Sequence, residues 1–213
     1  MPRVTVSSVS EQILDQAMQL FWERGYFDTS VDDLVARTGL SRAAIYTSFG
    51  SKQQLFAALL ERFRRLHTDL MLATLQPKDA AMPEVRAFFL RVRRALARRG
   101  SRLGCLLCAT AADPSAHMPH VAPIIRTFIA DLQALFAKTL RTAQEQGQLR
   151  YDGPIEPIAA CLAAQVVGLM TLARSPAPRR AITQAVEGVL HYLDGLSLPA
   201  TSSCPPTPSD ASR

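Results

Sequence analysis

Apolar residues recur every three or four positions along most of this chain, a spacing that predicts amphipathic α-helices. Segments with this period run from Ile13 to Phe21, from Ser51 to about Leu75, and through five further stretches. Those stretches, bounded by Pro or Gly residues or by the ends of their apolar stripes, are 83–100, 104–113, 124–147, 158–173 and 177–193. No strand-like alternation persists long enough to predict a sheet. With two short helices between residues 30 and 49, the pattern predicts an all-α protein of about nine helices.

The stretch Ile158–Ala173 differs from the others because it is apolar on nearly every side, with Gln165 and Thr171 as the main interruptions. A helix that is hydrophobic all round has to be buried all round, and one small domain rarely encloses a helix completely. The stretch is too short to predict a membrane span. We therefore expect it to pack, together with the helix that ends near Leu193, against the same pair of helices from a second chain.

The twenty residues from 30 to 49 predict two short helices joined by a tight turn. Ser30 and Asp33 have the spacing of a capping box at a helix start, and Gly39 suits a sharp helix end. Ser41 is placed to cap the second helix, whose outer face carries small, hydroxyl and guanidinium side chains. That face comprises Arg42, Ala43, Tyr46, Thr47 and Ser48. A helix that enters the major groove of DNA needs this arrangement, because small residues permit close approach and polar groups contact phosphates and base edges.

The flanks of this segment carry a resemblance to a known family. In the order of its elements, the N-terminal part of the chain resembles the tetracycline-repressor (TetR) family of bacterial regulators. The matching residues are Ile13–Phe21, Gly25-Tyr26, Thr29-Ser30-Val31, Asp33, Gly39-Leu40-Ser41, Ile45-Tyr46, Phe49 and Ser51-Lys52. Val35 and Ser48 depart from the pattern, since alanine and a second aromatic residue are common there. Ser48 is expected to remove one phosphate contact or to alter the sequence preference.

The resemblance implies a transcriptional regulator, more often a repressor, which a small-molecule effector releases from a palindromic operator in double-stranded DNA. Arg42 is the candidate guanine contact, and Ala43 and Thr47 are candidate readers of base edges. The candidate phosphate contacts are Ser41, Tyr46 and Lys52, with Arg3 as a further contact from an N-terminal arm.

The same resemblance predicts how the chain is divided. Residues 1–51 are expected to form the helix–turn–helix DNA-binding domain, and residues 52–198 a helical domain for effector binding and dimerisation. Family members are typically homodimers joined by their last two long helices. Residues 199–213 are rich in Pro, Ser and Thr and predict a disordered tail.

An effector cavity inside each subunit is also implied by the resemblance. The candidates to line it are Phe88, Phe89, Met118 and Phe128, which fall on predicted inner faces; for any one of them, plain core packing is the simpler interpretation.

Cys105 is a more specific candidate, because Gly104-Cys105-Leu106 resembles a subset of the family in which this cysteine senses electrophiles or oxidants. A thiol near a helix N-terminus is favoured as the thiolate, and Arg102 stands two residues away. The alternative is that Cys105 is buried core filler.

Composition and charge narrow the class of protein. The chain has a net charge of +6, but +5 of it lies in residues 66–103 and only +1 in residues 1–65, so bulk charge is weak evidence for DNA binding. The arginine-rich segment is expected to be a solvated helix face. The chain begins without the apolar run of a secretion signal, and its four cysteines suit a reducing compartment. We therefore expect a cytoplasmic protein that does not enter a membrane.

The sequence contains residues for two other site chemistries. Cys105, Cys108, His117 and His120 form a C-x2-C-x8-H-x2-H array of zinc-ligand types, but its central spacing is short and Pro114 and Pro119 interrupt it. A thiol oxidoreductase built on Cys105 and Cys108 would normally have a βαβ pattern beside it, which this sequence lacks. Neither a metal, a cofactor nor an enzymatic activity is expected.

Overall fold

The computed structural model describes residues 10–97 and 101–198, and all of their regular structure is helical apart from one isolated β-bridge. The α-helices are α1 (Glu11–Arg24), α2 (Val31–Thr38), α3 (Arg42–Phe49), α4 (Lys52–Phe63), α5 (Asp69–Leu72), α6 (Met82–Ala97), α7 (Leu106–Ala111), α8 (Ala122–Glu145), α9 (Ile155–Arg174) and α10 (Arg179–Leu196). The predicted all-α class is confirmed. The predicted tail and the arm residue Arg3 lie outside the described residues.

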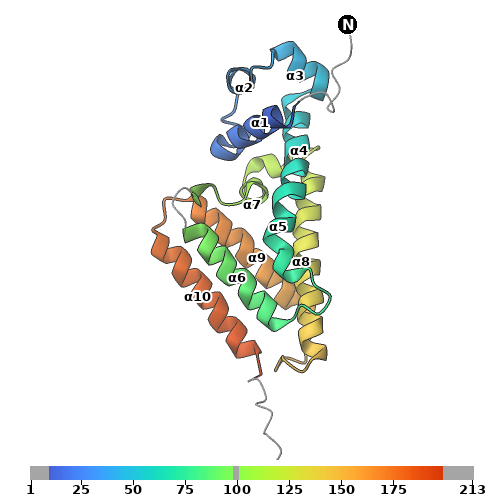
Figure 1. Ribbon diagram of the computed structural model, residues 1–213, viewed down its shortest axis with the longest axis vertical. Coiled ribbons are helices and arrows are strands. Elements are labelled where there is room, and N and C mark those ends of the chain that lie inside the picture. The colour runs from blue at the N-terminus through green and yellow to red at the C-terminus, as the bar shows by residue number, and fades with distance from the viewer. Residues whose placement is uncertain (1–9, 98–100, 199–213) are drawn as a thin grey trace, which may run out of the picture.

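The three N-terminal helices form a head at one end of the molecule, and α4 runs from this head into the larger helical body (Figure 1). The core of the head contains Phe21 of α1, Leu34 of α2 and Ile45 of α3, which are almost completely buried, and it is continuous with the core of the body. Phe56 of α4 closes this core, its ring centroid 4.8 Å from that of Phe21. The head therefore packs on the start of the helix that enters the body.

The helix predicted from Ser51 to Leu75 has the expected extent but is not regular. A π-helical turn, Arg64–Thr68, separates α4 from α5, and a 3-10 turn, Ala73–Leu75, ends the segment. Counted as one interrupted rod, α4 and α5 bring the described α-helices to the expected nine. Arg64, at the first position of the π-turn, makes ion pairs with Glu61 and with Asp131 of α8, so the irregular turn is tied to the body.

The body packs five helices around an apolar core. α8 and α9 lie against each other, and α10 packs on α6 and α9, as Figure 1 shows. At the far end, the antiparallel bridge between Leu149 and Ser197 fastens the loop after α8 to the end of α10. The last helix begins two residues later than predicted, because Pro178 is its extended N-cap, and it ends three residues later, at Leu196.

One face of α9 remains exposed within a single chain. Its buried side includes Leu162, Val166 and Leu169, whereas Ala164 and Gly168 are exposed. Among the described residues, α9 alone is long and apolar enough to cross a membrane by length and composition. The buried half of its surface is accounted for by α7, α8 and α10. The expectation that α9 is buried on every side is therefore not met by one chain alone.

Candidate DNA-binding interface

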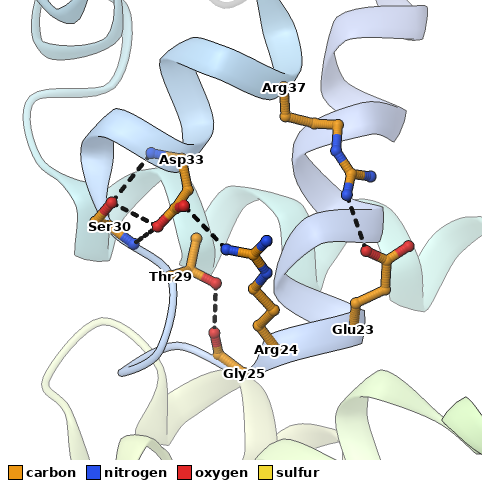
Figure 2. Close-up of polar contacts among 7 residues, drawn as sticks. All are labelled: Glu23, Arg24, Gly25, Thr29, Ser30, Asp33 and Arg37. Carbon is orange, nitrogen blue, oxygen red and sulfur yellow. Dashed lines mark hydrogen bonds and ion pairs between the residues drawn. The ribbon is translucent and has the colours of Figure 1, made fainter.

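The start of α2 is fixed by a complete capping box. The Asp33 amide donates to Ser30 Oγ at 3.0 Å, and the Ser30 amide donates to Asp33 Oδ2 at 2.8 Å (Figure 2). Because the Ser30 hydroxyl and amide both donate to the ionised carboxylate, they lower the pKa of Asp33, and Arg24 adds to this at 2.9 Å. The box predicted from the sequence thus also ties the end of α1 to α2.

Two further contacts hold α1 and α2 together (Figure 2). Arg37 pairs with Glu23 at 3.0 Å. The hydrogen bond from the Gln19 side-chain amide lowers the pKa of Glu23 most, and the Arg37 guanidinium lowers it further. The Thr29 hydroxyl, which is fully buried, donates to the Gly25 carbonyl at 2.7 Å and closes the turn between the helices. The position of α2 relative to α1 is therefore set by side chains within the head.

The turn between α2 and α3 follows the predicted chemistry. Gly39 has φ +71°, in the left-handed region, and its amide donates to the Val35 carbonyl at 2.9 Å. Ser41 then caps α3 by accepting from the Ala44 amide at 3.1 Å. These local bonds end α2, close the turn and start α3.

α3 presents the expected outer face to solvent. Ile45 and Phe49 point into the core of the head, at 1% and 8% exposed. The opposite side exposes Ser41, Arg42, Ala43, Tyr46 and Thr47. Small side chains at Ala43 and Thr47 leave the helix backbone accessible, so the face is shaped for close approach to a groove.

Ser48 differs from the other predicted contacts. The residue is half-buried, and its hydroxyl oxygen is buried with no hydrogen-bond partner among the described residues. It therefore lies at the edge of the α3 face with its hydroxyl turned inward.

Lys52 and Arg42 are both engaged by neighbours within the head. The Lys52 ammonium lies 4.2 Å from the centre of the Tyr26 ring, and partial burial lowers its pKa. Arg42 forms an ion pair with Asp32 at the start of α2. Asp32 was missed by the sequence analysis, since nothing local links two residues ten positions apart across a turn.

Besides the Asp15–Arg62 ion pair with α4, two polar links connect α1 to parts of the body beyond α4, and the sequence analysis missed them. The Trp22 indole donates to the Leu103 carbonyl at 3.1 Å. Arg174, at the end of α9, donates to the Trp22 carbonyl and, at 3.2 Å, to that of Glu23. Both links meet at the end of α1, so a shift in the body near residue 103 or 174 bears directly on the head.

The predicted effector residues occupy different surroundings. Phe88 and Phe89 are fully buried and pack with Phe136 in an aromatic cluster, with ring centroids 5.2–6.0 Å apart. Met118 is half-buried beside the core. Phe128 and Leu72 contribute to a pocket of about 360 Å³ between α5 and α8, which is open to solvent and is also lined by Arg64, Asp131 and Lys138.

Cys105 is the N-cap residue of α7 and is almost fully buried. The Cys108 thiol, which donates to its sulfur, is the main cause that lowers the pKa of Cys105; the amides of Cys108 and Leu107 add to it, against the opposing effect of burial. The same thiol contact and burial raise the pKa of Cys108 well above its usual range. Arg102 is exposed and is not among these causes, so the expected role of its charge is replaced by hydrogen bonds at the helix start.

The zinc-type array is not brought together. Within residues 10–97 and 101–198, no group of three or more His, Cys, Asp or Glu side chains is placed to hold a metal ion. The short α7 helix is followed by a 3-10 turn, Pro114–His117, so the chain changes direction between the cysteines and the histidines.

Comparison with known proteins gives two family matches. Residues 13–59 match the bacterial regulatory proteins of the tetR family, and residues 81–189 match the tetracyclin repressor-like C-terminal domain. The chain is 25% identical over 183 residues to an uncharacterized HTH-type regulator, YezE of Bacillus subtilis, covering 85% of this chain and 94% of YezE. It is 25% identical over 175 residues to the HTH-type transcriptional repressor ComR of Escherichia coli, covering 80% and 82%.

Solved structures share the fold over most of their length. A TetR-family regulator from Agrobacterium tumefaciens has a TM-score of 0.76 at 21% identity, covering 90% of this chain and 99% of that one. E. coli NemR in its reduced form has a TM-score of 0.74 at 20% identity, covering 89% and 97%. A cysteine-substituted CifR, solved with 26-bp operator DNA, has a TM-score of 0.71 at 26% identity, covering 90% and 98%.

Proposed function

Because this chain belongs to the TetR family of DNA-binding transcriptional regulators, we propose that it represses transcription from a near-palindromic operator and that a small molecule releases it. The observation that carries the proposal is the α3 face, capped by Ser41, supported from behind by Ile45 and Phe49, and open to solvent. Among its relatives, ComR is a repressor and CifR has been solved on operator DNA.

The roles on the α3 face follow from side-chain chemistry. Arg42 has the bidentate donors that guanine O6 and N7 accept, and Ala43 and Thr47 are small enough to lie against base edges. Ser41, Tyr46 and Lys52 supply donors for phosphates at the margins of the face. Ser48, with its hydroxyl turned inward, leaves its edge of the α3 face free of a large side chain. Two such faces in a dimer would dock in successive major grooves, about 34–36 Å apart.

The division into a head of residues 1–51 and a body of residues 52–198 fits this function. The head packs on α4 through Phe56 and the Asp15–Arg62 ion pair, and the Trp22–Leu103 and Arg174 bonds connect it to later parts of the body. An effector would bind more tightly to a state of the body in which these contacts with the head have shifted. It would stabilise that state, in which the two heads of the dimer lie farther apart, through its difference in affinity for the shifted and the DNA-binding states. The pocket beside Phe128 and Leu72 adjoins the interrupted rod of α4 and α5, which makes it the better supported effector site. Phe88 and Phe89 do not line this pocket.

The exposed face of α9 supports a homodimer. Ala164 and Gly168 on α9, with Gly188 and Tyr192 on α10, form a largely small-residue surface that a second copy would cover. A dimer of this kind works on DNA in the cytoplasm, without enzymatic activity.

A second candidate input is Cys105, which would respond to electrophiles or oxidants. The observation that favours it is the lowered pKa of this thiol at the start of α7, next to Cys108. Gly104-Cys105-Leu106 also resembles the subset of the family with a cysteine sensor. Alkylation of Cys105 should release operator DNA, whereas Cys105→Ser should stay bound; equal release from both would exclude this input.

DNA binding itself is tested with duplex DNA taken from upstream of the chain's own gene, by fluorescence anisotropy. Arg42→Ala should weaken binding by about 1–3 kcal/mol and relax the preference at one base position. Arg126→Ala, which removes the same charge from an exposed position of α8 without touching the head, is the matched control. Equal weakening on all sequences would make Arg42 a phosphate contact, and no binding by the parent to any duplex would reject the proposal.

A further inference from the structure

Asp32 is an acidic residue at the edge of the proposed DNA-binding face. Its carboxylate accepts from the Arg42 guanidinium, and the two side chains are 76% and 56% exposed. The neighbouring Asp33 has a clear structural task, since it completes the capping box and pairs with Arg24. Asp32 takes no part in that box, and its carboxylate instead links α2 to the first residue of α3.

A carboxylate here opposes the general attraction of a basic surface for DNA. Phosphates carry the negative charge of the duplex, and an exposed carboxylate close to them is repelled. With Asp32 beside it, Arg42 forms a nearly neutral pair rather than a free cation. A phosphate that approached this guanidinium would also approach the Asp32 oxygens. The pair therefore disfavours the use of Arg42 as a phosphate contact.

A guanine edge is accepted by the same pair without this repulsion. The guanidinium has five N–H donors in a planar fork. The contact with Asp32 occupies one edge of this fork. The remaining donors can reach guanine O6 and N7, which are neutral acceptors. Holding the guanidinium from one side also restricts its rotation, so less conformational freedom is lost when it binds the base.

We infer that Asp32 is a specificity-determining residue, which positions Arg42 to bind guanine and turns it away from phosphates. The inference rests on the proposed DNA-binding function. It adds that discrimination at one base position of each half-site depends on a residue of α2, outside the recognition helix.

The test is selection of binding sites from a random duplex library by the full-length parent, Asp32→Ala and Asp28→Ala. Asp28→Ala is the matched control, because Asp28 is exposed in the turn before α2 and its substitution removes the same charge from the head. The parent should prefer guanine at one position by about 5- to 150-fold. Asp32→Ala should reduce that preference at least about threefold, while Asp28→Ala should keep it.

Non-specific binding gives a second readout that points in the opposite direction. Asp32→Ala frees a cation for phosphates, so the affinity of this variant for a non-specific duplex should be higher than that of the parent. The affinity should also decrease more steeply with salt concentration, by about one unit in the log–log slope. In an Arg42→Ala background, Asp32→Ala should leave the base preference unchanged. Circular dichroism of each variant checks folding, which the capping box should preserve.

The outcomes separate the two claims. If the parent selects a site and Asp32→Ala shows the same base preferences, or changes no more than Asp28→Ala, Asp32 does not determine specificity and the proposed function stands. If the parent selects no site, the proposed function fails, and this inference fails with it.

Discussion

At the scale of single residues, the contrast between Cys105 and Cys108 shows how position decides chemistry. Both are buried, three residues apart at the start of α7. Cys105 accepts hydrogen bonds that favour its thiolate, and Cys108 donates one and keeps its proton. We therefore expect Cys105 to be the more nucleophilic member of the pair, because the thiolate is the nucleophile.

The pH dependence of alkylation tests this asymmetry. The rate at Cys105 follows its thiolate fraction, so a lowered pKa places the half-maximal rate at lower pH than for an ordinary thiol. Cys108→Ala removes the main hydrogen bond that lowers the pKa, and the profile should move to higher pH. The measurement is mass spectrometry of the Cys105 peptide after timed iodoacetamide treatment. Cys161→Ala, at an exposed cysteine of α9, should leave the profile in place; an unshifted profile in Cys108→Ala would contradict the assignment.

At the scale of elements, the head is built from helix ends rather than from long helices. α2 and α3 have eight residues each, a length at which isolated helices are marginal. Side-chain caps at Ser30 and Ser41 and the glycine end at Gly39 satisfy the exposed backbone groups at these termini. The orientation of the α3 face therefore depends on caps that are local in sequence.

Ser30→Ala should destabilise the protein by about 1 kcal/mol at neutral pH, because it removes the cap of α2. The effect should shrink in acid. The pKa of Asp33 is lowered in the folded protein, so its contribution is present above the unfolded pKa and is lost as the pH falls through the lowered value. Urea denaturation at pH 7 and below pH 4 measures both, with Ser30→Thr as the variant that keeps the cap. A difference between Ser30→Ala and the parent that is the same at both pH values would argue against the coupling to Asp33.

At the scale of the whole molecule, the exposed face of α9 links stability to assembly. Gly168 lies on this face, and a Cβ added there meets no atom within 4 Å in the single chain. The glycine is therefore not required by packing inside the subunit. A glycine inside a helix lowers helix stability, so its presence is best explained by close approach of another chain.

Gly168→Glu should accordingly leave the subunit folded and break the dimer. The introduced carboxylate has room in one chain but would be buried without a partner between two. Analytical ultracentrifugation should give a mass near 23.3 kDa for this variant and twice that for the parent. Ala95→Glu, at an exposed position of α6, is the control that should stay dimeric. A parent of monomeric mass would remove the basis for two heads on one operator.

The sequence alone determined what depends on neighbours three or four residues apart. Apolar periodicity predicted the helices, and the Ser30–Asp33 box, Gly39 and Ser41 predicted the turns that define the head. Side-chain caps and helical stripes are short-range, so they are visible in a single sequence. For the same reason the outer face of α3 was predicted with only the inward hydroxyl of Ser48 placed differently.

Tertiary structure decided which distant residues meet. The Asp32–Arg42 pair, the Trp22–Leu103 bond and the pocket beside Phe128 rather than Phe88 all depend on the angles at which helices cross. Those angles result from the packing of many side chains at once. No local pattern specifies them, because each contact is set by the summed shape of two surfaces rather than by the residues that happen to touch.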